Sequence, residues 1–332
     1  MNPKTLPNRF GRIALCVLLS AAFWSAVIPR VAAQTISLVE PRLVANKEAA
    51  FKLTNSVSGN FLIETSSNLV DWEGLVTLSS IGSVQQTDSA AVYLDHRFYR
   101  AASVPGTNVL TGDHLATANG DLVIHPINHA SLVLGWNGKT IYNDPVGGST
   151  PYSGLSRADL ILVSHAHTDH YDAATLSAVK GAGAVILAPS AVYQAMPTAL
   201  KSLTTVLANG DQTNVLGIKV EAVPMYNLTS GRLQYHVKGQ GNGYVLTIGG
   251  KRIYLSGDTE DTPEMRALTN LDVAFICMNL PYTMSVQQAS AVVRVIRPRV
   301  VYPYQYSGSN VGPFKTQVGT DLGIEVRLRK WY

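Results

Sequence analysis

Residues 36 to 103 contain short runs in which apolar and polar side chains alternate. Turn-forming Asn, Ser and Gly residues separate these runs, and no segment has a helical period. This pattern predicts short β-strands that pack into a small β-sandwich. The runs are Phe51–Thr54, Phe61–Thr65, Leu75–Leu78 and Ala91–Leu94. We therefore expect an all-β accessory domain over residues 34–103.

The pattern changes after residues 104–112, which contain Pro and Gly and which we interpret as a linker. From residue 113 to 332, strand-like runs are interspersed with helical segments, which indicates an α/β architecture with helices covering sheets. The expected strands are Leu122–Ile124, Ser131–Leu134, Thr140–Tyr142, Ala184–Leu187, Tyr244–Ile248, Arg252–Leu255 and Val273–Cys277. The expected helices are Ala173–Lys180, Pro263–Leu268 and Val286–Val295.

Residues 1–33 resemble an export signal. Three basic residues precede the apolar run Ile13–Ile28, and Val31-Ala32-Ala33 fits a small-residue cleavage site. A retained membrane anchor is the alternative, but the run of about 16 residues is shorter than the roughly 20 that a spanning helix needs. We therefore predict cleavage before Gln34 and a periplasmic or extracellular protein.

Cleavage would also change the charge balance. Four of the 26 Lys and Arg residues lie within the signal, and the remaining 22 equal the 22 Asp and Glu residues. A formally neutral mature chain gives no indication of a nucleic-acid partner. Of the two cysteines only Cys277 would remain, in an apolar run, where we expect a buried, inert thiol.

The segment from Ser164 to Asp172 carries the clearest chemistry. Three histidines and an aspartate, His165, His167, Asp169 and His170, follow the apolar run Leu160–Val163. Side chains two residues apart face the same side of an extended chain, so His165 and His167 can bind one ion. A solvated polar loop would not need three imidazoles, and imidazole with carboxylate suits zinc. The segment predicts a metal site.

Two more residues extend this site. A zinc ion bound by His165 and His167 needs a third protein ligand. Of the eight histidines only His236 lies beyond the cluster, so we predict that it binds. Asp258 follows a predicted strand in Gly257-Asp258-Thr259, where its carboxylate could bridge two ions.

The His165–His170 motif with Gly257-Asp258-Thr259 resembles the metallo-β-lactamase-fold hydrolases. It is similar to the branch with the ascorbate-phosphate lactonases and the N-acyl-phosphatidylethanolamine phospholipase D. The matches His129-Ala130-Ser131 and Tyr142-Asn143-Asp144-Pro145-Val146 extend the resemblance over roughly residues 120–332.

The resemblance implies an αββα four-layer sandwich with the site at one edge, between two β-sheets. It implies that His165, His167 and a third histidine hold one metal. Asp169, His170 and a later histidine would hold a second metal, and Asp258 would bridge them.

Two departures from the family pattern bear on the site. At the place where relatives often have their third histidine, this chain has Pro224-Met225-Tyr226-Asn227, so either His236 or Asn227 completes the first position. Imidazole favours His236. Gln305 stands where relatives often have the last histidine, in Tyr302-Pro303-Tyr304-Gln305-Tyr306. We therefore expect a weak second position, with Mn²⁺ or Fe as alternatives to Zn²⁺.

The chemistry that follows is metal-dependent hydrolysis of an ester, lactone or phosphodiester in a small-molecule or lipid substrate. Asp169 is the candidate base, and His129 and Tyr304 either orient the substrate or are packed polar side chains. The alternative is a secreted metal-binding protein of the same fold without activity.

The N-terminal domain also has a resemblance. Residues 61–72 with Arg97-Phe98-Tyr99-Arg100 resemble a β-sandwich module often appended to secreted bacterial proteins. Its aromatic residues Trp72, Phe98 and Tyr99 form either a cell-surface or glycan contact or, as we favour, part of a packed core or domain interface.

Overall fold

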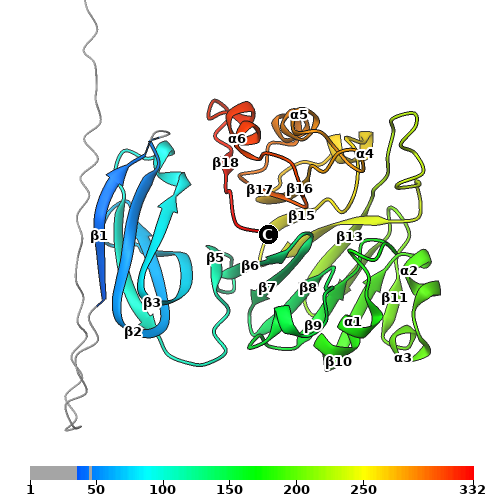
Figure 1. Ribbon diagram of the computed structural model, residues 1–332, viewed down its shortest axis with the longest axis horizontal. Helices are drawn as coiled ribbons and strands as arrows, with labels where there is room; N and C mark the ends of the chain where they lie inside the picture. Colours follow the sequence, from blue (N-terminus) through cyan, green and yellow to red (C-terminus); the bar gives the residue numbers. More distant parts are fainter. Residues whose placement is uncertain (1–35, 45–46) are drawn as a thin grey trace, which may run out of the picture. The chain divides into compact units, whose positions relative to one another are not determined.

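The computed structural model describes residues 36–44 and 47–332, so the predicted signal at 1–33 lies outside the described residues. The chain divides into two compact units between Gly106 and Thr107 (Figure 1). In the described ranges, no helix has the length and apolar character needed to cross a membrane.

The N-terminal unit is built on one long β-hairpin. Its elements are β1 (Ile36–Leu43), β2 (Ala49–Ser66), β3 (Glu73–Asp88), the 3-10 helix η1 (Ser89–Tyr93) and β4 (Phe98–Val104). Strand β3 pairs with β2 along most of its length, while β1 and β4 pair with successive halves of the other edge of β2. The register shifts between Asn55 and Gly59, which divides β2 into two halves.

The two halves share one core. Phe51 and Leu53 from the first half lie in the same buried cluster as Phe61 and Ile63 from the second. The Tyr99 ring lies 4.7 Å from the Phe51 ring, and the Tyr99 hydroxyl donates to Asp88. Because Tyr99 is buried, it cannot contribute to an exposed glycan-stacking surface.

The structure changes two details of the strands predicted for this unit. The runs at 51–54 and 61–65 are strand, as predicted, but both belong to β2, because the register shift breaks the alternation without ending the strand. The run at 91–94 falls mainly in η1, where the Asp88 side chain accepts from the Ala90 amide and caps the turn in place of a strand.

The second unit contains two sheets (Figure 1). One consists, in spatial order, of β5 (Gly112–Leu115), β6 (Leu122–Asn128), β7 (Ser131–Trp136), β8 (Lys139–Asn143), β9 (Ala158–Leu162), β10 (Lys180–Ala188) and β11 (Thr204–Val206). The other consists of β12 (Gln212–Val215), β13 (Ile218–Pro224), β14 (Asn242–Ile248), β15 (Lys251–Leu255), β16 (Val273–Cys277), β17 (Val300–Tyr304) and β18 (Glu325–Val326). Each begins with antiparallel pairs and ends with parallel ones.

Helices cover the outer face of each sheet (Figure 1). The helices α1 (Ala173–Val179), α2 (Ser190–Ala195) and α3 (Thr198–Lys201) share a core with the first sheet, and α4 (Pro263–Arg266), α5 (Val286–Ile296) and α6 (Gly312–Val318) share one with the second. A short 3-10 helix, η2 (Thr150–Tyr152), follows β8. The predicted αββα sandwich is confirmed. Cys277 is fully buried, as expected.

The strand ends determine where polar residues gather. Asp144 follows β8, the histidine segment follows β9, Asp258 follows β15 and Gln305 follows β17. Strand β8 pairs in parallel with β9, and β15 and β17 each pair in parallel with β16, so the carboxyl ends within each sheet reach the same edge. The candidate residues of the two sheets therefore meet at one edge of the sandwich.

Candidate metal centre

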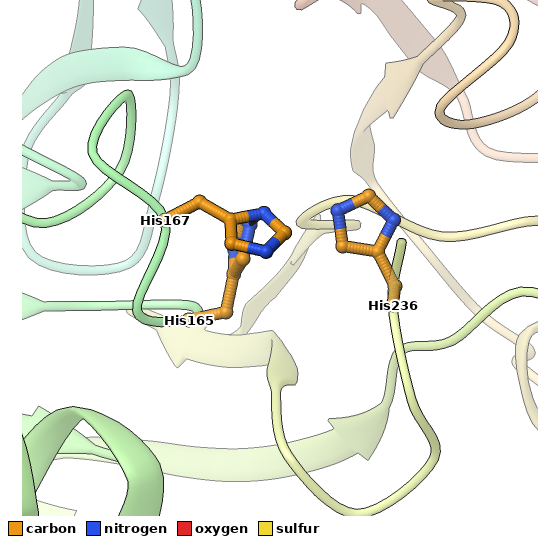
Figure 2. Close-up of side chains that lie close together, drawn as sticks. All are labelled: His165, His167 and His236. Atoms are coloured by element: carbon orange, nitrogen blue, oxygen red, sulfur yellow. Dashed lines mark hydrogen bonds between the residues drawn. The ribbon is translucent and has the colours of Figure 1, made fainter. Parts of the chain in front are cut away.

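Three histidines converge from two loops. His165 and His167 lie on the loop after β9, and His236 lies on the loop between β13 and β14. Figure 2 shows the His236 ring facing the other two rings from the opposite side. His165 Nε2 lies 3.0 Å from His167 Nδ1, and the His236 ring is 5.1 Å from each of the other rings.

This spacing fits a metal ion. Donors bound at about 2.0–2.1 Å in a tetrahedron lie roughly 3.3 Å apart, close to the separation of the His165 and His167 nitrogens. In the part of the chain that the structure describes, buried His170 Nε2, His236 Nε2 and Asp258 Oδ1 have no hydrogen-bond partner. Buried polar atoms are normally paired, so these atoms at one place indicate a site that a cation completes.

The loop that carries His236 is held by polar contacts. Asn227 Oδ1 lies 3.3 Å from His236 Nδ1, and the Asn227 amide nitrogen donates to the carbonyls of Arg232 and Tyr282. Buried Glu260 accepts from the Leu228 and Thr229 amides. Asn227 thus contacts His236 from behind, and the structure places His236, not Asn227, beside His165 and His167.

A second ligand set lies next to the first. His170 Nε2 lies 3.3 Å from Asp258 Oδ1 and 3.7 Å from Asp169 Oδ2. Asp258 Oδ2 lies 3.4 Å from His236 Nε2, so this carboxylate reaches both sets. His129, which we expected to orient substrate, has its Nε2 3.0 Å from Asp169 Oδ2 and groups with Asp169 and His170.

Asp144 is a functional residue that sequence reasoning missed. Fully buried, it accepts from the Ser164 amide at 2.7 Å and lies 2.8 Å from His170 Nδ1. A carboxylate on the far nitrogen of a histidine fixes the ring so that the other nitrogen faces a metal. The sequence feature that could have indicated this role is the position of Asp144 directly after the buried strand β8.

Gln305, which directly follows β17, contacts the site as a hydrogen-bond donor and not as a metal ligand. Its Nε2 donates to Asp258 Oδ2, and its backbone has a positive φ of 43°. The amide therefore contacts the carboxylate that lies between the two ligand sets.

Of the two alternatives left open for Tyr304, the structure shows the packed polar side chain and not a residue that orients substrate. Its side chain is fully buried, and its ring packs against Phe275 and Trp331. Its hydroxyl accepts from the Gly257 amide at 2.8 Å and so holds the turn before Asp258. Gly257 has a φ of +60°, and a Cβ there would lie 2.6 Å from Met225 Sδ, so this turn requires glycine.

The buried charges interact strongly. Burial disfavours the charged form of His170, but Asp258 and Asp144 outweigh it and raise the pKa of His170 well above its usual range. Burial and the charge of His170 lower the pKa of His165 well below its usual range. Burial opposes ionisation of Asp258, yet the charges of His170 and His165 hold its pKa well below the usual range. The carboxylates require positive charge here, which a metal ion can supply.

Comparisons of sequence identify relatives of the second unit. A family model described as a beta-lactamase superfamily domain matches residues 124–305. A UPF0173 metal-dependent hydrolase of Pyrococcus abyssi is 34% identical over 51% of this chain and 77% of its own length. One from Thermus thermophilus is 33% identical over 54% of this chain and 82% of its own length.

Two solved structures similar to this chain are also described as hydrolases. A Parabacteroides distasonis protein described as a metal-dependent hydrolase is 40% identical, with a TM-score of 0.62 over 67% of this chain and 99% of that chain. A metallo hydrolase of Ignicoccus hospitalis is 22% identical, with a TM-score of 0.54 over 63% of this chain and 95% of that chain, and shares the fold.

Proposed function

We propose that this chain, which belongs to the beta-lactamase superfamily and is a metal-dependent hydrolase, uses zinc and is exported. Its substrate is an ester, a lactone or a phosphodiester of a small molecule or lipid. The observation that carries this proposal is the pair of adjacent ligand sets that share Asp258.

The three histidines and Asp169 have different chemical roles. His165, His167 and His236 would hold a divalent metal, which would supply a water of lowered pKa and polarise the substrate oxygen. Asp169 is half-exposed beside this triad, and its carboxylate receives the proton of the attacking water. Burial opposes ionisation of Asp169, but the hydrogen bond from His129 and the charge of His170 lower the pKa of its carboxyl. Asp169 is therefore ionised at neutral pH and can act as a base.

The surroundings of His236 favour a substrate with an apolar group. The segment that carries His236 exposes Leu228, Leu233 and Val237. Tyr282, on a neighbouring segment, is also exposed and packs its ring 5.0 Å from that of Tyr235. Of these side chains, Val237 and Tyr235 line the small pocket that also contains the three histidines, and an apolar pocket wall favours binding of an apolar group. An acyl chain or an aryl ring attached to the scissile bond fits this surface.

Export is proposed from residues 1–33, whose charge and apolar run have the character of a signal. Expression of the full chain in a bacterial host, with mass spectrometry of the purified N-terminus, tests this. A mature chain that begins at Gln34 in the periplasmic or medium fraction is expected. An uncleaved chain in the cytoplasm would contradict export.

The activity is tested with aryl esters, lactones and bis(aryl) phosphodiesters. His167→Ala should reduce hydrolysis by more than about 100-fold, because even the outer partners of metal ligands cost about 10–100-fold when removed. His96→Ala, at an exposed position in the N-terminal unit, is the matched control and should retain full activity. Undiminished hydrolysis of every substrate by His167→Ala would refute the proposal. Intact metal binding without turnover of any substrate would favour a binding protein instead.

A further inference from the structure

We propose that His129, and not Gln305, completes the second metal position, where it joins Asp169 and His170 with Asp258 between the two ions. This inference concerns how the metal is held. It rests on the metal-dependent part of the proposed function and not on the substrate.

The donor atoms of the second position lie as close together as the ligands of one ion. His129 Nε2, Asp169 Oδ2 and His170 Nε2 form one compact group of donor atoms. Their separations are 3.0 Å for His129 to Asp169 and 3.7 Å for His170 to Asp169, which bracket the roughly 3.3 Å expected for ligands of one zinc ion. His170 Nε2 is buried and has no hydrogen-bond partner among the described residues. A buried polar atom normally has a partner, and a cation bound together with Asp169 would provide one.

Backbone and side-chain contacts fix the position of His129. It lies in the tight turn between β6 and β7 with a φ of +54°, and its amide donates to the Trp331 carbonyl. Its Nδ1 lies 2.7 Å from the hydroxyl of Tyr332, which accepts from the Ser307 amide. In the tautomer with its proton on Nδ1, donated to Tyr332, Nε2 would carry a lone pair that a metal could bind in place of the contact with Asp169. Metal-binding histidines almost always have such a partner on the other nitrogen.

Gln305 contacts the site as a hydrogen-bond donor. Its NH₂ group donates to Asp258 Oδ2, so the group nearest the bridging carboxylate is a donor that cannot bind a metal. An amide oxygen is also a poor zinc ligand beside an available imidazole. The backbone of Gln305 donates to the His129 carbonyl, which ties the two residues together. Gln305 therefore orients Asp258, while His129 supplies the imidazole.

The inference is tested by counting ions in the full chain. Protein freed of metal with a chelator is dialysed against a series of free zinc concentrations, and bound zinc is measured by mass spectrometry. The wild-type chain should bind two ions, the second more weakly. His129→Ala should bind one ion at zinc concentrations that fill both wild-type positions, and Gln305→Ala should still bind two.

Tyr332→Phe provides a milder variant in case His129→Ala does not fold, which circular dichroism will show. It should weaken only the second ion, by about 10–100-fold, because it removes the partner of the His129 Nδ1 proton. Two ions of unchanged affinity in both His129→Ala and Tyr332→Phe would overturn the inference, as would loss of the second ion in Gln305→Ala alone. One ion in the wild-type chain would also overturn it, while leaving a mononuclear hydrolase intact. Two ions without turnover would leave it standing and refute the proposed activity.

Discussion

Two clusters of buried polar side chains lie in the second unit, and they differ in how their charges are balanced. The metal cluster contains His165, His167, His170, His236 and Asp258. The arginine cluster contains Asp113, Tyr302, Glu325, Arg327 and Arg329. The first has buried lone pairs without hydrogen-bond partners among the described residues, whereas the second is internally paired.

The pairing in the arginine cluster is close to complete. Asp113 accepts from Arg329 at 2.9 Å and from the Tyr302 hydroxyl at 2.7 Å. Arg327 pairs with Glu325 at 2.8 Å and also donates to Tyr302. A cluster whose charges are paired with one another stabilises the fold. A cluster with unpaired donor atoms can bind a ligand. Burial and charge alone would not separate the two, but the pattern of hydrogen bonds does.

The largest expected effect tests the structural role of the arginine cluster. Asp113→Asn removes the carboxylate that pairs with Arg329 and leaves buried positive charge, which should lower the free energy of unfolding by about 3–5 kcal/mol. Urea denaturation at pH 7 measures this. As a control, Asp321→Asn breaks an exposed pair with Arg294 and should change stability by less than about 1 kcal/mol. Equal effects of the two variants would mean that the arginine cluster does not stabilise the fold as argued.

A second variant examines the metal cluster through Asp144. Asp144→Asn keeps the shape of the side chain but removes the charge that faces His170 Nδ1. The affinity for the second zinc ion should fall by about 10–100-fold, as is usual for a partner of a metal-binding histidine. Zinc dialysis measures this, and folded Asp113→Asn protein is the control with normal affinity. Loss of zinc affinity in Asp113→Asn but not in Asp144→Asn would reverse the roles assigned to the two clusters.

The local part of the metal site was predictable from the sequence, together with His236 and Asp258 from distant segments, but the remaining contacts of the site were not. The His165–His170 segment is a short motif whose spacing alone determines that its side chains can meet. His129, Asp144 and Tyr332 join it only because distant segments end at the same edge of the sandwich. The sequence could not decide between the two alternatives for Tyr304, because a tyrosine beside a site residue can equally well be buried, with its hydroxyl paired to backbone.

The smallest expected effect is a pH dependence in the arginine cluster. Burial disfavours the Asp113 carboxylate, but Arg329 and Arg327 outweigh it and lower its pKa below the usual range. A lowered pKa stabilises the folded state above the unfolded pKa of about 3.9, and this stabilisation is lost as the pH falls towards the folded pKa. The stability difference between wild-type protein and Asp113→Asn should therefore narrow below about pH 4. A difference that stays constant from about pH 7 to about pH 3 would contradict this ionisation.

The central claim is that the unpaired donors of the metal cluster hold the zinc that hydrolysis requires. The most direct measurement adds zinc stepwise to metal-free wild-type protein and records bound zinc and hydrolysis on the same samples. The account predicts no hydrolysis without zinc, activity that rises as ions bind, and two ions per chain at saturation. Full hydrolysis by zinc-free protein, or a folded chain that binds no zinc, would contradict it.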